Sequence, residues 1–313
     1  MDIKHGKQIE IENISEQDIS LFLFAVNHEK RAYTAYNRIN KVNSIKKSIA
    51  LCYNDYFKIE ETSKLLKHTI KSPNEVSKLL DNEFSNLKND DIKIVIDYSC
   101  MTKPWYYTMI LYLKKKKTEF NSITVYFIYT PSKHEIPQKP KPNSEIAPLP
   151  GKYIVPTDKP KALIVCLGYE QSKAEGIIEH LDPKECFLFY SKPALDDEFV
   201  KKIEQNNSNI LLENKNIITF PLNNLLILER ELTSLYYLLK DDYHIIIAPL
   251  GPKPFTFMSM LLSIKHREID IWRVGSGPDI NEYNREPINN DTFIISEVLF
   301  VKNIGKENSF YFN

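Results

Sequence analysis

The chain has 313 residues, enough for two domains of ordinary size, and its 42% hydrophobic and 26% charged residues are typical of a globular protein and exclude a disordered one. Its 41 basic residues are balanced by 41 acidic ones, and this zero net charge argues against binding of extended nucleic acid. The sequence has no secretory signal, no apolar run long enough to span a membrane, and four scattered cysteines, so we expect a cytoplasmic protein with reduced thiols.

Short apolar strands alternate with helical segments along the first 130 residues, a pattern typical of a parallel sheet covered by helices. Pro104 follows an apolar strand at a position that the first turn of a helix tolerates. The predicted strands are 19–26, 48–53, 92–98 and 122–129, and the predicted helices are 29–42, 60–70, 74–88 and 104–117.

A proline-rich stretch, residues 131–160, is predicted to be an extended connector to a second half with the same alternation. The sequence therefore predicts an α/β protein of two tandem Rossmann-like, three-layer domains with mainly parallel sheets, one over 1–130 and one over 161–313. In the second half the predicted strands are 161–168, 185–191, 216–222, 244–251 and 269–275, with one or two edge strands in 291–303, and the predicted helices are 170–180, 196–206, 223–240 and 254–266.

The two halves match each other at an offset of about 140–150 residues. The segment Lys103-Pro104-Trp105 aligns with Lys253-Pro254-Phe255, and each comes after an apolar strand. Glu29 aligns with Glu170, again just after a strand. These matches indicate an internal duplication, or at least a shared fold.

Polar residues follow the buried strands of both halves. In open parallel sheets, ligands bind outside the carboxyl ends of the strands, near the point where the strand order reverses. A hydroxyl group, a lysine and a helix N-terminus gathered there suit an anion such as phosphate. The candidate ligand-binding residues are Asn27, His28, Glu29, Arg31, Ser99, Thr102 and Lys103 in the first half and Glu170, Gly251 and Lys253 in the second.

The same residues also have structural interpretations. Asp97 or Ser99 can cap the helix that follows, and Glu29 and Arg31 can form an ion pair with each other. The segment around Lys253 can be a rigid turn. The sequence contains neither a glycine-rich dinucleotide fingerprint nor a P-loop, and no spacing of cysteines and histidines that suits a metal, so we expect no cofactor and no metal ion.

The segment IVIDYSCMTKPWYYTMILYL (94–113) resembles a characteristic motif of CARF-type Rossmann domains, in which a buried strand is followed by a hydroxyl-rich turn, Thr-Lys and a helix. Two such units in one chain resemble the SAVED domains of bacterial anti-phage systems. The resemblance implies binding of a cyclic oligonucleotide at paired strand ends. It also implies that phosphate or sugar is contacted by Ser99, Thr102, Lys103, Gly251 and Lys253.

Three functions fit these features. The first is a ligand-sensing protein that binds a nucleotide or other phosphorylated small molecule between its halves and signals to a protein partner or effector. The resemblance implies that such a sensor acts in anti-phage defence. The second is an enzyme, a hydrolase or transferase acting on nucleotides or sugar phosphates, with Glu29 or Asp97 as the catalytic base. The third is a structural component of a defence assembly, whose strand ends would be covered by a partner or by the connector.

Overall fold

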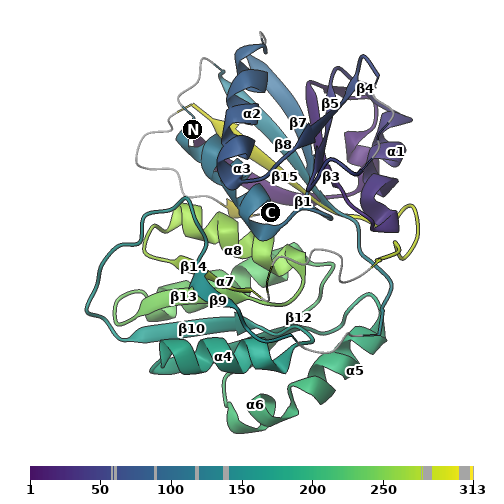
Figure 1. The fold of residues 1–313 in the computed structure, drawn as a ribbon. Coiled ribbons are helices and arrows are strands. Elements are labelled where there is room, and N and C mark those ends of the chain that lie inside the picture. The colour runs from purple at the N-terminus through teal and green to yellow at the C-terminus, as the bar shows by residue number, and fades with distance from the viewer. Residues whose placement is uncertain are drawn as a thin grey trace. The chain divides into compact units, whose positions relative to one another are not determined.

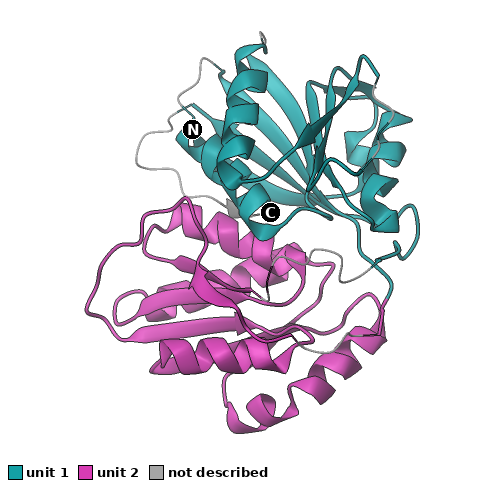
Figure 2. Cartoon of the chain, viewed as in Figure 1, with its two compact units in different colours: residues 1–133, 283–313 teal, residues 134–282 magenta. Residues whose placement is uncertain are grey.

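The chain folds as two compact units (Figures 1 and 2). Unit 1 comprises residues 1–133 and 283–313, and unit 2 comprises residues 134–282. Among the described residues, no helix is both long and apolar enough to cross a lipid bilayer. The computed structural model describes residues 1–57, 59, 62–87, 90–116, 120–136, 141–275, 277, 284–302 and 311–312. Parts of the predicted elements lie outside these residues, at 60–61, 88, 117, 137–140 and 303.

Unit 1 is built on a mixed sheet of eight strands. Its strands are β1 (Asp2–Ile9), β3 (Leu21–Val26), β5 (Ser48–Cys52), β6 (Leu65–Thr69), β7 (Asp91–Asp97), β8 (Ser122–Tyr129), β15 (Ile294–Val301) and β16 (Tyr311–Phe312), in the order β16-β1-β15-β8-β7-β3-β5-β6. The five strands from β8 to β6 are parallel, whereas β15 runs antiparallel to both β8 and β1. A separate parallel pair is formed by β2 (Asp18–Ile19) and β4 (Ser44–Ile45).

Helices cover both faces of this sheet (Figure 1). They are the 3-10 helices η1 (Ile11–Ile14) and η2 (Lys30–Tyr33) and the α-helices α1 (Thr34–Asn40), α2 (Pro73–Ser85) and α3 (Lys103–Lys115). On one face, Ala35 and Ile39 of α1 share a core with Phe22 and Phe24 of β3. On the other face, α2 packs beside α3. Because β3 is buried on both faces, its uninterrupted apolar sequence LFLFAV is explained by its place in the middle layer.

Unit 2 has a six-stranded sheet. Its strands are β9 (Glu145–Pro148), β10 (Lys161–Cys166), β11 (Glu185–Ser191), β12 (Ile217–Phe220), β13 (His244–Pro249) and β14 (Asp270–Gly275), in the order β12-β11-β10-β13-β14-β9. All neighbours are parallel except β9, which runs antiparallel to β14. The helices are α4 (Gln171–Leu181), α5 (Asp197–Asn206), α6 (Ser208–Glu213), α7 (Leu225–Leu239) and α8 (Lys253–Lys265). Side chains of α4 and α5 pack on one face of the sheet, while α7 and α8 pack together.

The parallel strands of the two units have the same order. Numbered along the chain within each unit, both sheets read 3-2-1-4-5: β6-β5-β3-β7-β8 in unit 1 and β12-β11-β10-β13-β14 in unit 2. This order confirms the prediction of two Rossmann-like α/β sheets. It also fixes where the strand order reverses, between β3 and β7 and between β10 and β13, which are the places where such sheets bind ligands.

One predicted helix is wrong, and the strand at the start of the chain was not predicted. The helix expected over 60–70 is wrong where the chain is described, because residues 65–69 form β6, which pairs parallel with β5. Its sequence LLKHT is half-buried and too short to distinguish a strand from a helical turn by periodicity. The strand β1 was not predicted, because its residues are mostly polar and only Gly6 is fully buried.

The domain boundaries also differ from those expected. Residues 283–313, expected in the second domain, belong to unit 1, where β15 pairs with β8 along its whole length and lies inside the sheet. Residues 145–148, expected in the connector, form β9 at the edge of the unit 2 sheet. An apolar pattern identifies a strand but not the sheet that it joins, so neither assignment could be read from the sequence.

Candidate functional site

The candidate residues gather at the two places where the strand order reverses. We call the carboxyl ends of β3, β7 and β8, residues 27–31, 97–103 and 129–130, the first strand mouth. The carboxyl ends of β10 and β13, residues 167–170 and 250–253, are the second strand mouth. Each strand mouth lies within one unit.

A buried arginine holds the first strand mouth together. The side chain of Arg31 is 1% exposed, and its Nε donates to Oε2 of Glu29 at 2.7 Å. The two terminal nitrogens donate to the carbonyl oxygens of Thr130, at 2.7 Å, and Ser99, at 3.0 Å. Its guanidinium also lies over the ring of Tyr129, 5.4 Å from the centroid. One side chain thus joins the ends of β3, β7 and β8, and the predicted pairing of Glu29 with Arg31 is present.

The groups around Arg31 keep its guanidinium positively charged. Burial acts to lower the pKa of the guanidinium, but Tyr129 and Glu29 beside it more than offset this, so the pKa stays above its ordinary value. Glu29 also accepts a hydrogen bond from Asn27 Nδ2 at 3.2 Å, and its backbone N–H donates to Asn27 Oδ1. Arg285 approaches the same carboxylate oxygen of Glu29, Oε1, at 3.9 Å, whereas Arg31 is bonded to Oε2. The carboxylate therefore meets positive charge or a donor at both oxygens.

The Asp97 side chain stabilises a local turn at the end of β7. Its Oδ1 accepts hydrogen bonds from the backbone N–H of Ser99, at 2.9 Å, and from Ser99 Oγ, at 2.5 Å. The same Ser99 hydroxyl accepts from the backbone N–H of Thr130 at 2.7 Å. Asp97 and Ser99 are 2% and 0% exposed. They brace the turn and the end of β8, and neither caps α3, which begins four residues after Ser99.

Thr102 and Lys103 begin the helix that leaves this mouth. Thr102 is the N-cap of α3 and Lys103 its first residue, both half-buried, with Pro104 in the first turn. Beside them, the ring of Tyr53 stacks on Trp105 with centroids 4.3 Å apart, and its hydroxyl donates to the carbonyl oxygen of Cys100 at 2.6 Å. Burial first of all raises the pKa of the Tyr53 phenol well above its usual value. This neutral aromatic pair fixes the start of α3.

Two glycines shape the second strand mouth. A Cβ atom on Gly168 would lie 2.6 Å from the carbonyl oxygen of Leu250, and one on Gly251 would lie 2.6 Å from both the Leu167 oxygen and the Cys166 sulfur. The two loops after β10 and β13 therefore approach each other through their backbones. This contact requires glycine at both positions. The structure brings Gly168 and Gly251 together, and Lys253 follows as the first residue of α8.

The remaining residues of the second mouth are held by neighbours in unit 2. Glu170 is the N-cap of α4 and forms an ion pair with Lys173 one turn later. The ring of Tyr169 stacks on Phe199, with centroids 5.7 Å apart, and His134 contacts both rings edge-on. The backbone N–H of His134 donates to Asp196 at 3.1 Å. A residue of the predicted connector therefore covers Tyr169.

In the described part of the chain, the cysteines and the potential metal ligands form no further site. No disulfide joins the four cysteines, and burial raises the pKa of the Cys186 thiol to about 11 and that of Cys52 above its usual value, so both thiols are unreactive at neutral pH. No cluster of three potential metal ligands occurs in the part of the chain that the structure describes.

Sequence reasoning missed Tyr129 and Thr130, which complete the Arg31 network. The sequence did mark them, since they lie at the end of the predicted strand 122–129. That this strand neighbours β7 depends on the sheet order, which the sequence does not show. Asn27 lies in the network, whereas His28 is half-buried beside it.

Neither the family models nor the curated proteins contain a match to this sequence.

Proposed function

We propose that the chain is a ligand-sensing protein that binds a nucleotide or another phosphorylated small molecule at the carboxyl ends of its parallel strands. One observation carries the proposal: in both units the next element after the fourth strand of a 3-2-1-4-5 sheet is a 13-residue helix that begins with Lys-Pro. Lys103 and Lys253 thus occupy equivalent positions, each next to the point where its strand order reverses.

The chemistry of these positions suits an anion. The first N–H groups of a helix have no partner within the helix, and the helix dipole adds partial positive charge at that end. The N-cap residues Thr102 and Pro252 give these helix ends no side-chain hydrogen bond within the described part of the chain. A lysine at the first position adds a full positive charge, so phosphate is the ligand group that we expect.

The first mouth favours binding over turnover. A catalytic base needs a carboxylate that can accept a proton from the substrate. Asp97 is buried and accepts two hydrogen bonds from Ser99, and Glu29 is paired with Arg31. Both candidate bases stabilise the fold of the mouth, and this supports the sensor more than a hydrolase or transferase.

The resemblance to CARF and SAVED domains makes the proposal more specific. Under it, the ligand is a cyclic oligonucleotide, the protein acts in the cytoplasm in anti-phage defence, and a partner or effector receives the signal. Ser99 then acts through the turn that it braces, because its hydroxyl already contacts Asp97 and Thr130. Thr102 and Lys103 remain the residues proposed to contact the phosphate.

One observation favours the structural component as the second candidate. His134, from the predicted connector, packs on Tyr169 and Phe199 at the second mouth. A covered mouth is what that function predicts. In this case only the first mouth would bind a ligand, or neither would.

The test is calorimetry with a panel of nucleotides and cyclic oligonucleotides, preceded by native mass spectrometry of the purified protein to detect a bound nucleotide. We expect Lys103→Ala and Lys253→Ala each to weaken binding by at least about tenfold, the usual loss for one charge-assisted hydrogen bond. The matched controls are Lys78→Ala in unit 1 and Lys215→Ala in unit 2, both exposed and remote in sequence from the mouths. Equal affinity of all four variants would refute the proposal, and product formation would transfer support to the enzyme.

A further inference from the structure

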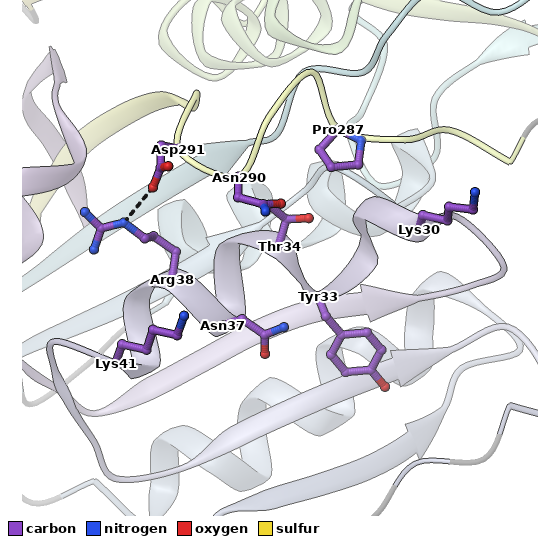
Figure 3. Close-up of a pocket in the computed structure, with 9 residues that line it drawn as sticks. All are labelled: Lys30, Tyr33, Thr34, Asn37, Arg38, Lys41, Pro287, Asn290 and Asp291. Carbon is purple, nitrogen blue, oxygen red and sulfur yellow. Dashed lines mark hydrogen bonds and ion pairs between the residues drawn. The ribbon is translucent and has the colours of Figure 1, made fainter.

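A pocket of about 500 Å³ lies in unit 1, between the helical stretch η2–α1 and the segment 287–291 (Figure 3). Its helical wall is a single face, because the lining residues recur at intervals of three and four from Lys30 to Lys41. The opposite wall is formed by Pro287, Asn290 and Asp291. The pocket is of the size that small-molecule ligands occupy.

The charged residues of the lining are mostly cationic. Lys30, Arg38 and Lys41 contribute three positive charges, against a single carboxylate, Asp291. Asn37, between them on the helix, adds an amide. This set of donors suits an anion with several acceptor oxygens, and phosphate is such a group.

Two of these cations are held by exposed carboxylates. Arg38 Nε donates to Asp291 Oδ1 at 3.2 Å, the contact drawn in Figure 3, and Arg38 Nη2 lies 3.8 Å from Glu12 Oε1. Lys30 pairs with Glu286. The Asp291 side chain is 80% exposed and that of Glu286 is 40% exposed. Exposed pairs of this kind are screened by solvent and contribute little, so an incoming phosphate can replace them.

The wall that carries Asp291 is anchored through its backbone. Lys133 N–H donates to the Glu286 carbonyl oxygen at 3.0 Å, and Ile288 N–H donates to that of Pro131 at 3.1 Å. Asp291 N–H donates to Asn289 Oδ1 at 2.9 Å. Only the Asp291 side chain has to rotate for Arg38 to exchange its partner, so the pocket keeps its shape.

We propose that this pocket is a second binding site, for a phosphorylated small molecule whose phosphate takes the place of Asp291 on Arg38 and is also contacted by Lys41. The site uses one face of η2–α1 and shares Lys30 with the range that defines the first strand mouth. It includes neither Lys103 nor Lys253, and it does not depend on the function proposed for the strand mouths. In the unoccupied protein Asp291 acts as an internal competitor for the ligand.

The test is calorimetry with AMP and inorganic phosphate, with adenosine as the uncharged probe, on full-length protein carrying Lys103→Ala and Lys253→Ala so that binding at the strand mouths is weakened. We expect AMP and phosphate to bind and adenosine not to bind. Arg38→Gln and Lys41→Gln should each weaken AMP binding about tenfold, and Lys78→Gln should leave it unchanged.

The decisive variant is Asp291→Asn. It removes the competing charge while keeping the backbone hydrogen bond to Asn289, and we expect AMP to bind several times more tightly. A gain of affinity is not expected of a residue that only supports the fold. The proposal is overturned if the parent protein binds neither AMP nor phosphate, or if Asp291→Asn binds AMP no more tightly than the parent.

Discussion

Replacing Arg31 with methionine tests the role assigned to the buried network. Methionine fills much of the space of arginine but carries no donor. The substitution leaves the Glu29 carboxylate, 8% exposed, without its partner at 2.7 Å, and it removes the donors to the carbonyl oxygens of Ser99 and Thr130. The ends of three strands then lose their common contact.

The expected cost follows from these contacts. Removing one partner of a buried ion pair typically costs about 3–5 kcal/mol, because the other charge remains buried. We therefore expect Arg31→Met to lower the free energy of unfolding of unit 1 by about 3–5 kcal/mol. Adding Glu29→Gln removes the stranded charge, so the double variant should be more stable than Arg31→Met alone. The control Arg38→Met breaks an exposed pair and should cost less than about 1 kcal/mol.

The sequence itself offers a way to measure unit 1 separately. Its two tryptophans are divided between the units, Trp105 in unit 1 and Trp272 in unit 2. In a Trp272→Phe background, tryptophan fluorescence during urea unfolding reports on unit 1 alone. A loss below about 1 kcal/mol for Arg31→Met, or a double variant less stable than the single one, would refute the assigned role.

Three further predictions concern unit 2. Gly251→Ala should destabilise it by about 1–3 kcal/mol, because the new Cβ would meet the Leu167 oxygen at 2.6 Å. The control Gly275→Ala, whose nearest contact is 3.6 Å, should cost less than about 1 kcal/mol. Both are measured by urea unfolding in a Trp105→Phe background, in which Trp272 reports on unit 2. Burial lowers the pKa of Lys152 to about 8, so between about pH 8 and 10.5 the unfolded chain binds one proton more than the folded chain. The free energy of unfolding should therefore rise with pH across that window, by about 1–3 kcal/mol more than in Lys152→Met. Parallel pH curves for the two proteins would contradict this. Burial against Tyr236 lowers the pKa of His266 to about 4, so the free energy of unfolding should fall as pH drops from about 6.5 to 4. His266→Phe should remove about 1–2 kcal/mol of that loss, measured by urea unfolding at pH 7 and 4.5. An equal loss of stability at low pH in both proteins would count against this prediction.

The sequence was sufficient to predict the parallel strands whose side chains are buried. The runs 92–98 and 244–251 stand out because strands in the middle of three layers need apolar residues on both faces. β1 and β6 lie toward the edges of the sheet and are only partly buried, so their patterns are weak. The sheet joined by β15 depends on a partner far away in the sequence, which no local pattern specifies.

The candidate site was predictable in position but not in the roles of its residues. The ends of the strands were correctly located, since polar residues after an apolar run mark them. Whether a polar residue stabilises the fold or remains available to a ligand depends on contacts such as that of Arg31 with Thr130, 99 residues later. Glu29, Asp97 and Ser99 have the residue types of a reactive site, yet their atoms mainly satisfy one another and Arg31.

The two strand mouths reach the same geometry by different means. In each unit, the two neighbouring strands at the point where the order reverses, β3 and β7 or β10 and β13, end close together, and the polar backbone groups at these ends need hydrogen-bond partners. The first mouth meets this need with a buried charge, Arg31, and the second with close backbone contact at Gly168 and Gly251. A glycine contact leaves no side chain to recognise a ligand, so Lys253 must provide most of the specific contact at the second mouth. In the first mouth Thr102 stands beside Lys103. If both mouths bind phosphate, Lys253→Ala should therefore be the more damaging of the two lysine substitutions when each mouth is measured separately.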